Sequence, residues 1–266
     1  MKAIVCVKQV PDTSGKVAVK ADGTLDRASM ATITNPDDLN ALEAALKLKD
    51  ETGCEVVVVT MGPPPAEGML RELLARGADK AVLVSGREFG GSDTFATSQI
   101  LAAAVNKIGV GPEDVVFCGR QAIDGDTAQV GPQIAEKLHL PQVTYVADIQ
   151  KDGNSLTVKR MLEDGYMTIK AQTPCLITCI KELNTPRYMS VSGVFECYSK
   201  PMKVLDYEAL KDHPLIDATT IGLKGSPTNI LTSFTPPQKG AGQMLEGNDM
   251  ATCEKLAGIL LEKHII

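Results

Sequence analysis

The sequence predicts an α/β fold: an open, twisted parallel sheet with helices on both faces, an antiparallel extension and a long irregular C-terminal arm. Up to about residue 140, short apolar runs alternate with amphipathic segments, as in parallel sheets that are covered on both faces. From Gln142 onwards the apolar spacing changes to two, which predicts antiparallel strands. Between residues 183 and 250, many Gly, Pro and polar residues separate short apolar pieces, so this part is expected to lie on another surface.

Each element of the first half has a local signal. Helices are predicted where a capping residue, a Pro or an acidic residue precedes apolar positions at helical spacing. These helices cover residues 36 to 53, with Asn35 or Thr34 as cap, 66 to 76, 93 to 106, and 126 to 138. The strands between them cover residues 3 to 10, 55 to 61, 81 to 85 and 115 to 118. A short hairpin is predicted over residues 16 to 25, around Ala21-Asp22-Gly23.

The second half is predicted to begin with an antiparallel meander. Its four strands cover residues 143 to 149, 155 to 161, 166 to 171 and 175 to 180. The last predicted helix, residues 250 to 263, has an apolar face of Leu256, Ile259 and Leu260 that requires a partner. We therefore expect an α/β domain over residues 1–182, including the antiparallel strands within 142–180, and a C-terminal arm over residues 183–266.

Composition limits the class of protein. Of 266 residues, 44% are apolar, which is enough for a large buried core. The net charge of -6 and the absence of clustered Lys and Arg disfavour nucleic acid or an anionic membrane as a main partner. No run approaches the roughly 20 apolar residues that cross a bilayer, and the apolar N-terminal run is too short for a signal peptide. We expect a globular cytoplasmic protein without membrane insertion, whose seven cysteines are mostly reduced core residues.

The stretch from Val115 to Leu138 has the layout of a phosphate-binding loop, because an apolar strand meets a Gly- and Asp-rich turn that opens into a helix. A helix start leaves backbone N–H groups without partners and carries partial positive charge, so it favours an anion. Three glycines allow close approach of the backbone, and Thr127 and Gln129 can donate. Asp126 suits a helix cap and Asp124 an Asx turn. The other interpretation is a capped turn without ligand, since neither common phosphate-loop motif is present.

Other strand ends should meet this loop, because ligands of open parallel sheets bind beyond the carboxyl ends of the strands. Lys8 is either a solvated strand end or a phosphate contact. Arg120 could pair with a phosphate or steady Asp124. Asp93, Thr94 and Thr97 fit helix caps, with a ribityl or phosphate contact as the second interpretation.

Four motifs resemble the β subunit of electron transfer flavoproteins, over essentially the whole chain. They are Val5-Cys6-Val7-Lys8-Gln9-Val10-Pro11-Asp12, Asn35-Pro36-Asp37-Asp38, the run from Gly119 to Pro132, and Leu183-Asn184-Thr185-Pro186-Arg187-Tyr188. The third is the most specific, since it extends over a dozen positions. The resemblance implies a Rossmann-like, adenine nucleotide-binding fold and a heterodimer with an α subunit that carries FAD on a mobile domain.

The resemblance also implies a second nucleotide in the β subunit. Housekeeping members hold AMP there, whereas electron-bifurcating members hold FAD, which takes hydride from NADH and sends electrons to two acceptors. Thr60-Met61-Gly62-Pro63-Pro64, the Gly125-Asp126-Thr127-Ala128 form of the loop and Gly225-Ser226-Pro227-Thr228 resemble the bifurcating group. The implied partners are an acyl-CoA dehydrogenase or reductase and, as low-potential acceptor, ferredoxin or flavodoxin. No residue of this chain is expected to be catalytic by itself, because the redox chemistry belongs to the cofactor.

The implied sites are two. Adenine is expected near Cys6, Val7, Asn35 and Met61, and the diphosphate along residues 122 to 131. The full set of expected cofactor-binding residues is Cys6, Val7, Lys8, Asn35, Asp38, Met61, Gly62, Pro63, Asp93, Thr94, Thr97, Gly119, Arg120, Gln121, Ala122, Asp124, Gly125, Asp126, Thr127, Ala128, Gln129, Val130 and Gly131. The expected partner-docking residues are Leu183, Asn184, Pro186, Arg187 and Tyr188. Without the resemblance, Leu183 could equally pack on its own sheet.

Two other functions are alternatives to this one. An ATP-binding regulator that resembles universal stress proteins would explain the first 140 residues but not the C-terminal arm. A hydrolase that uses Asp124 and Asp126 would lack a nucleophile and a basic partner.

Overall fold

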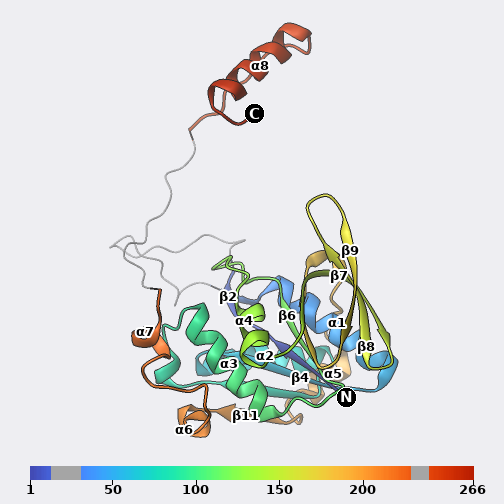
Figure 1. Cartoon of the computed structure of the whole chain (residues 1–266), viewed down its shortest axis with the longest axis vertical. Helices are drawn as coiled ribbons and strands as arrows, with labels where there is room; N and C mark the ends of the chain where they lie inside the picture. The colour runs from blue at the N-terminus through green and yellow to red at the C-terminus, as the bar shows by residue number, and fades with distance from the viewer. Residues whose placement is uncertain (13–30, 229–239) are drawn as a thin grey trace.

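The computed structural model describes residues 1–12, 31–228 and 240–266, and a sheet of nine strands forms its centre (Figure 1). The first seven strands of this sheet are mutually parallel, and the last two extend it in antiparallel pairing. The spatial order is β11 (Met202–Leu205), β5 (Lys80–Val84), β4 (Glu55–Met61), β1 (Lys2–Cys6), β6 (Val115–Gly119), β10 (Cys175–Cys179), β7 (Gln142–Asp152), β8 (Ser155–Met161) and β9 (Tyr166–Gln172). The predicted open parallel sheet with an antiparallel extension is confirmed. The predicted hairpin over residues 16–25 lies outside the described residues.

Helices cover both faces of the sheet, as predicted (Figure 1). On one face, α1 (Pro36–Thr52) and α2 (Glu67–Arg76) share a core with Ala3 and Val5 of β1. On the other face, α3 (Thr94–Ile108) and α4 (Val130–Lys137) share a core with Ile4 and Cys6. Neighbouring residues of β1 therefore point into opposite cores, which is why the parallel strands have continuous apolar sequences.

The prediction that residues 175–180 form an antiparallel strand was wrong. Strand β10 lies between β6 and β7 and is parallel to both. All five of its residues are buried, so it packs against helices on two faces, which is the environment of a central strand. The antiparallel meander consists only of β7, β8 and β9.

Two further segments differ from the prediction. The first predicted strand ends at Cys6, and Gln9–Pro11 (β2) pairs instead with Thr32–Thr34 (β3) in a separate two-stranded sheet. In the segment expected to be irregular, β11 adds a parallel edge strand to β5.

The C-terminal segment also contains α5 (Val191–Glu196), α6 (Tyr207–Leu210), α7 (Gly222–Gly225) and α8 (Met250–Glu262). Elsewhere in the described chain, single 3-10 turns occur at Pro64–Ala66 (η1), Arg87–Phe89 (η2) and Lys181–Leu183 (η3). Helix α8 buries none of its residues and stands apart from the sheet (Figure 1), so the partner predicted for its apolar face remains a prediction. Six of the seven cysteines are free and buried, and Cys253 is exposed. None of the described helices has the length and apolar character of a membrane span.

Candidate nucleotide site

The loops that follow β1 and β6 meet the start of α1 at the carboxyl edge of the parallel sheet. Asn35, immediately before α1, is fully buried, and both the nitrogen and the oxygen of its side-chain amide bind the loop after β6. Its Nδ2 donates to the Gln121 carbonyl at 2.8 Å, and its Oδ1 accepts from the Ile123 backbone N–H at 3.1 Å. Asn35 is the N-cap residue, as predicted, but its side chain makes no capping bond. It shapes the loop instead.

Asp38, in the first turn of α1, ties the same loop to the end of β1. Its two oxygens accept from the backbone N–H groups of Lys8, at 2.8 Å, and Gly119, at 2.9 Å. A Cβ at Gly119 would lie 2.3 Å from Asp38 Oδ1, so only glycine permits this approach. Burial raises the pKa of Asp38 to about 7, although the two N–H donors oppose that shift.

Helix α4 begins later than predicted, and the proposed Asp126 cap was wrong. The helix starts at Val130, after a turn in which Asp126 and Ala128 have left-handed φ values of 50° and 52°. Asp126 accepts from Gln121 Nε2 at 2.8 Å, so its side chain closes the turn rather than capping a helix. Short polar side chains such as Asp tolerate this backbone region, which explains why a good capping residue is found here without a helix.

Two charge pairs form beside the loop, and whether Lys8 or Arg120 also contacts a phosphate stays a prediction. Lys8 Nζ donates to both oxygens of Asp124, at 2.7 and 2.8 Å, so Lys8 neutralises the loop. Arg120 Nε lies 3.4 Å from Asp37 Oδ2 and pairs with that carboxylate rather than with Asp124. Burial raises the pKa of Asp37, and the Arg120 charge lowers it.

The residues before α4 fit a phosphate group. Within the described part of the chain, the backbone N–H groups of residues 127 to 131 have no acceptor, and they precede the first intrahelical bonds of α4. Gly131 packs so closely on β10 that a Cβ would lie 2.9 Å from Thr178 Cγ2, whereas nothing lies within 4 Å of a Cβ at Gly125. The loop is therefore tight at its ends and open in its middle. The neighbouring carboxylates of Asp124 and Asp126 already have partners. The free backbone N–H groups can therefore donate to a phosphate or diphosphate.

The start of α3 borders this loop. Asp93 caps the helix, as predicted, by accepting from the Ala96 N–H at 3.0 Å, and it also accepts from the Thr228 N–H at 2.9 Å. Thr94 Oγ1 donates to Gln129 Oε1 at 2.8 Å, which links α3 to the loop. Thr97 Oγ1 lies 3.5 Å from the Ser92 carbonyl. The contact between Thr228 and Asp93 was not visible in the sequence, because the two residues are 135 positions apart.

The residues expected around adenine lie on adjacent strand ends. Cys6 and Val7 are buried, Met61 and Gly62 are half-buried, and Pro63 is exposed. The Val7 N–H donates to the Val59 carbonyl, and β1 and β4 are neighbours in the sheet. The Ala122 carbonyl accepts from the N–H groups of both Gly125 and Asp126 and so closes the turn before the free amides.

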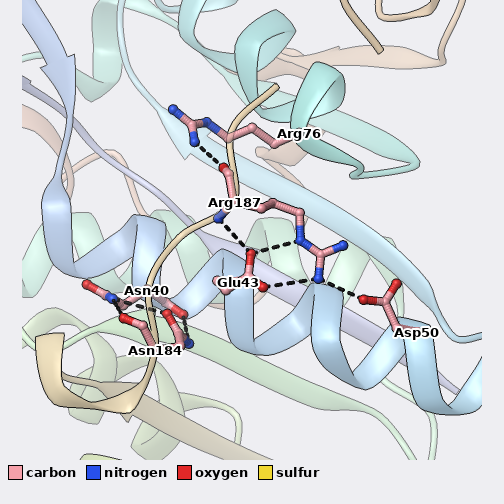
Figure 2. A network of polar contacts seen from close by, with 6 residues as sticks. All are labelled: Asn40, Glu43, Asp50, Arg76, Asn184 and Arg187. Atoms are coloured by element: carbon pink, nitrogen blue, oxygen red, sulfur yellow. Dashed lines mark hydrogen bonds and ion pairs between the residues drawn. The ribbon is translucent and has the colours of Figure 1, made fainter. Parts of the chain in front are cut away.

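The segment after β10, residues 183 to 198, contains the expected docking residues, of which Figure 2 shows Asn184 and Arg187. Leu183 is half-buried against the core beside α1, and Pro186 is also half-buried. Asn184 and Arg187 bind side chains of α1, whereas Tyr188 is 90% exposed. Sequence reasoning missed the neighbouring exposed apolar side chains, which are Val191, Val194, Phe195 and Tyr198. Their close spacing in a short apolar helix was the available signal.

A parallel sheet whose strand ends carry a Gly-rich loop before a helix start has the architecture of the dinucleotide-binding α/β class. The family model described as "Electron transfer flavoprotein domain" matches residues 22–209. The chain belongs to the electron transfer flavoprotein family.

Relatives match over the full length of both chains. The chain is 70% identical to the "Acryloyl-CoA reductase electron transfer subunit gamma" of Anaerotignum propionicum. It is 52% identical to the "Caffeyl-CoA reductase-Etf complex subunit CarD" of Acetobacterium woodii and 47% identical to the "Electron transfer flavoprotein subunit beta" of Thermoanaerobacterium thermosaccharolyticum. One of these names gives a β subunit, and the other two include a CoA-ester reductase. The full-length match includes the C-terminal segment that a universal-stress-like regulator would leave unexplained.

Proposed function

We propose that this chain is the β subunit of a heterodimeric electron transfer flavoprotein and that the loop from Gly119 to Gly131 holds the diphosphate of an FAD. When bound, FAD supplies hydride acceptance from NADH and the transfer of electrons to two acceptors. The observation that carries the proposal is the set of backbone N–H groups at residues 127 to 131 that have no acceptor among the described residues, in a chain similar to reductase electron-transfer subunits. Hydrogen bonds to a charged phosphate contribute about 1.5 to 3 kcal/mol each, so a few of them supply much of a tight site.

The side chains of the site act mainly on the loop. Asn35 and Asp38 fix its beginning, and Gln121 holds Asp126. Lys8 neutralises Asp124, which reduces the repulsion between an acidic turn and a phosphate. The adenine is expected where the ends of β1 and β4 lie side by side, near Val7 and Met61.

The proposed partners are an α subunit and an acyl-CoA dehydrogenase or reductase, with ferredoxin or flavodoxin as the low-potential acceptor, all in the cytoplasm. The proposed docking surface extends from Leu183 through Tyr188 to Phe195. Apolar and aromatic side chains that are mostly exposed on one segment are typical of protein interfaces. The exposed α8 helix is proposed to pack on the α subunit.

A second candidate is a subunit that holds AMP as a structural group. A row of free amides would bind one phosphate as well as two, which supports this alternative. The open space at Gly125 favours the larger diphosphate, because no atom of the described residues lies within 4 Å of a Cβ at this position.

The test is co-expression with the α subunit, followed by measurement of flavin and AMP per heterodimer after extraction. Two FAD per heterodimer, with one reducible by NADH, is the expected result. One FAD with one AMP would establish the second candidate. A colourless protein that does not pair with the α subunit would refute both.

A further inference from the structure

The segment after β10 is fixed to helix α1 by an ion pair of Arg187 (Figure 2). Glu43 is 5% exposed, and its carboxylate accepts from the Arg187 backbone N–H at 3.0 Å, from Nε at 2.9 Å and from Nη2 at 3.0 Å. Nη2 also donates to Asp50 Oδ2 at 2.7 Å. The hydrogen bonds that the Arg187 guanidinium donates to the Glu43 and Asp50 carboxylates raise its pKa. The positive charge of Arg187 is therefore paired with carboxylates of the same chain.

A pair of amides repeats this attachment one helical turn earlier (Figure 2). Asn40 Nδ2 donates to the Asn184 carbonyl at 2.8 Å, and Asn184 Nδ2 donates to the Asn40 carbonyl at 3.0 Å. Asn40 is 4% exposed. Residues 40, 43 and 50 lie three and seven positions apart, so they share one face of α1.

Helix α1 holds the nucleotide loop with its first turn and residues 184 to 187 with its following turns. Asn35 and Asp38 bind Gln121, Ile123 and Gly119, as described above. A single helix of 17 residues thus sets the distance between the two segments.

The far end of the same segment is fixed to α2. A Cβ at Gly193 would lie 2.1 Å from the Ala75 carbonyl oxygen, so α5 packs on α2 at backbone distance. Arg71 Nη1 donates to the Cys197 carbonyl at 2.9 Å. Between these anchors, Tyr188 and Val191 are directed to solvent.

We propose that Arg187 is a positioning residue that fixes the docking surface relative to the nucleotide loop and does not itself contact the reductase-type partner. This inference rests on the proposed function and reassigns one residue that the sequence placed among the partner contacts. The partner contacts the exposed apolar side chains, and the Glu43 pair keeps them in place for electron delivery.

Glu43 distinguishes the two roles. If Arg187 positions the segment, Glu43→Gln disturbs the segment as well, because it weakens the same pair. If Arg187 contacts the partner, Glu43→Gln frees the guanidinium and leaves partner binding unchanged or tighter. In Arg187→Gln alone, Glu43 remains buried without a cation, so the double variant should be less disturbed than this single one.

The first measurement is hydrogen exchange of residues 184–190 in the full chain, alone and with its α subunit. Variants are Arg187→Gln, Glu43→Gln, the double variant, and Lys47→Gln as an exposed control on α1. We expect exchange of residues 184–190 to be at least about tenfold faster in Arg187→Gln, which corresponds to about 1.4 kcal/mol. The double variant should recover part of the protection, and exchange at residues 119–131 should not change. Unchanged exchange would overturn the inference.

The second measurement is electron delivery to the acyl-CoA reductase-type partner at varied partner concentration. Both single variants should raise the KM for the partner at least fivefold, while NADH-dependent flavin reduction stays within twofold of wild type. A raised KM in Arg187→Gln with a normal KM in Glu43→Gln would identify Arg187 as a contact and overturn the inference. If the wild-type protein delivers no electrons, the proposed function fails, and the exchange measurement still decides the role of Arg187.

Discussion

Replacement of Asn35 by Ala should loosen the nucleotide loop more than it destabilises the fold. The substitution removes two hydrogen bonds, to the Gln121 carbonyl and from the Ile123 N–H. At about 1 kcal/mol for each bond, the loss is about 2 kcal/mol, or roughly thirtyfold in the equilibrium between the fixed and the open loop. Because Gln121 and Ile123 are only half-buried, water can reach the released groups and limit the cost.

The assay is the FAD content of the heterodimer after dialysis, together with urea unfolding of the chain. Asn35→Ala should retain well under half of the wild-type β-site FAD. Asn35→Asp keeps the acceptor for Ile123 but places an oxygen opposite the Gln121 carbonyl, so it should also lose FAD. Thr52→Ala is the matched control, since it removes side-chain hydrogen bonds at the other end of α1. Equal FAD contents in Asn35→Ala and Thr52→Ala would refute this account of the loop.

Three more predictions test the same region. Gly119→Ala places a Cβ 2.3 Å from Asp38 Oδ1 and should lower the free energy of unfolding by about 1 to 3 kcal/mol. Gly125→Ala has open space around the new Cβ and should change the free energy of unfolding by less than about 0.5 kcal/mol. Equal urea midpoints for the two variants would contradict this. Burial raises the pKa of Asp38 from 3.8 to about 7, so the native state binds this proton more tightly and stability should fall as pH rises from about 4 to about 7, by up to about 1.4 kcal/mol per pH unit. Asp38→Asn should remove that slope, and a slope equal to that of wild type would show that another group causes it. Lys8→Met should change stability by less than about 1 kcal/mol, because the pair is partly exposed, yet weaken FAD retention at low salt; Lys8→Arg should restore it, and failure to do so would argue against a charge effect.

Local sequence patterns were sufficient for the parallel sheet and its helices but not for the place of every strand. The continuous apolar run of β10 carries the signal of a central strand, yet the three alternating strands before it favour a fourth antiparallel strand. Strand β11 has only four residues, and one of them is buried. Its assignment depends on pairing with β5, which lies more than a hundred positions earlier in the sequence.

The loop was predictable in outline, because glycines between an apolar strand and a helix predict a turn that leaves backbone N–H groups free at the helix start. Its phosphate-binding role stays a prediction. The partners of its side chains were not predictable. Lys8 binds Asp124 across 116 positions, and Asn35 binds Ile123 across 88. Asp126 was misassigned because a residue that suits a cap also suits a left-handed turn, and only the tertiary structure selects between the two.

The composition of α1 explains how one helix can organise two loops. Its apolar residues, such as Leu42 and Leu46, pack on the sheet, while Asp38, Asn40 and Glu43 are buried beneath loops from distant parts of the chain. A buried polar group destabilises a protein unless it is hydrogen-bonded, so each of these residues favours only the arrangement in which its loop is in place. The stability of α1 and the geometry of both loops are therefore linked. A substitution at a polar position of α1 should affect the loop that it binds before it affects the sheet. Substitution of Asn35 should therefore change nucleotide retention, and substitution of Glu43 should change electron delivery to the partner.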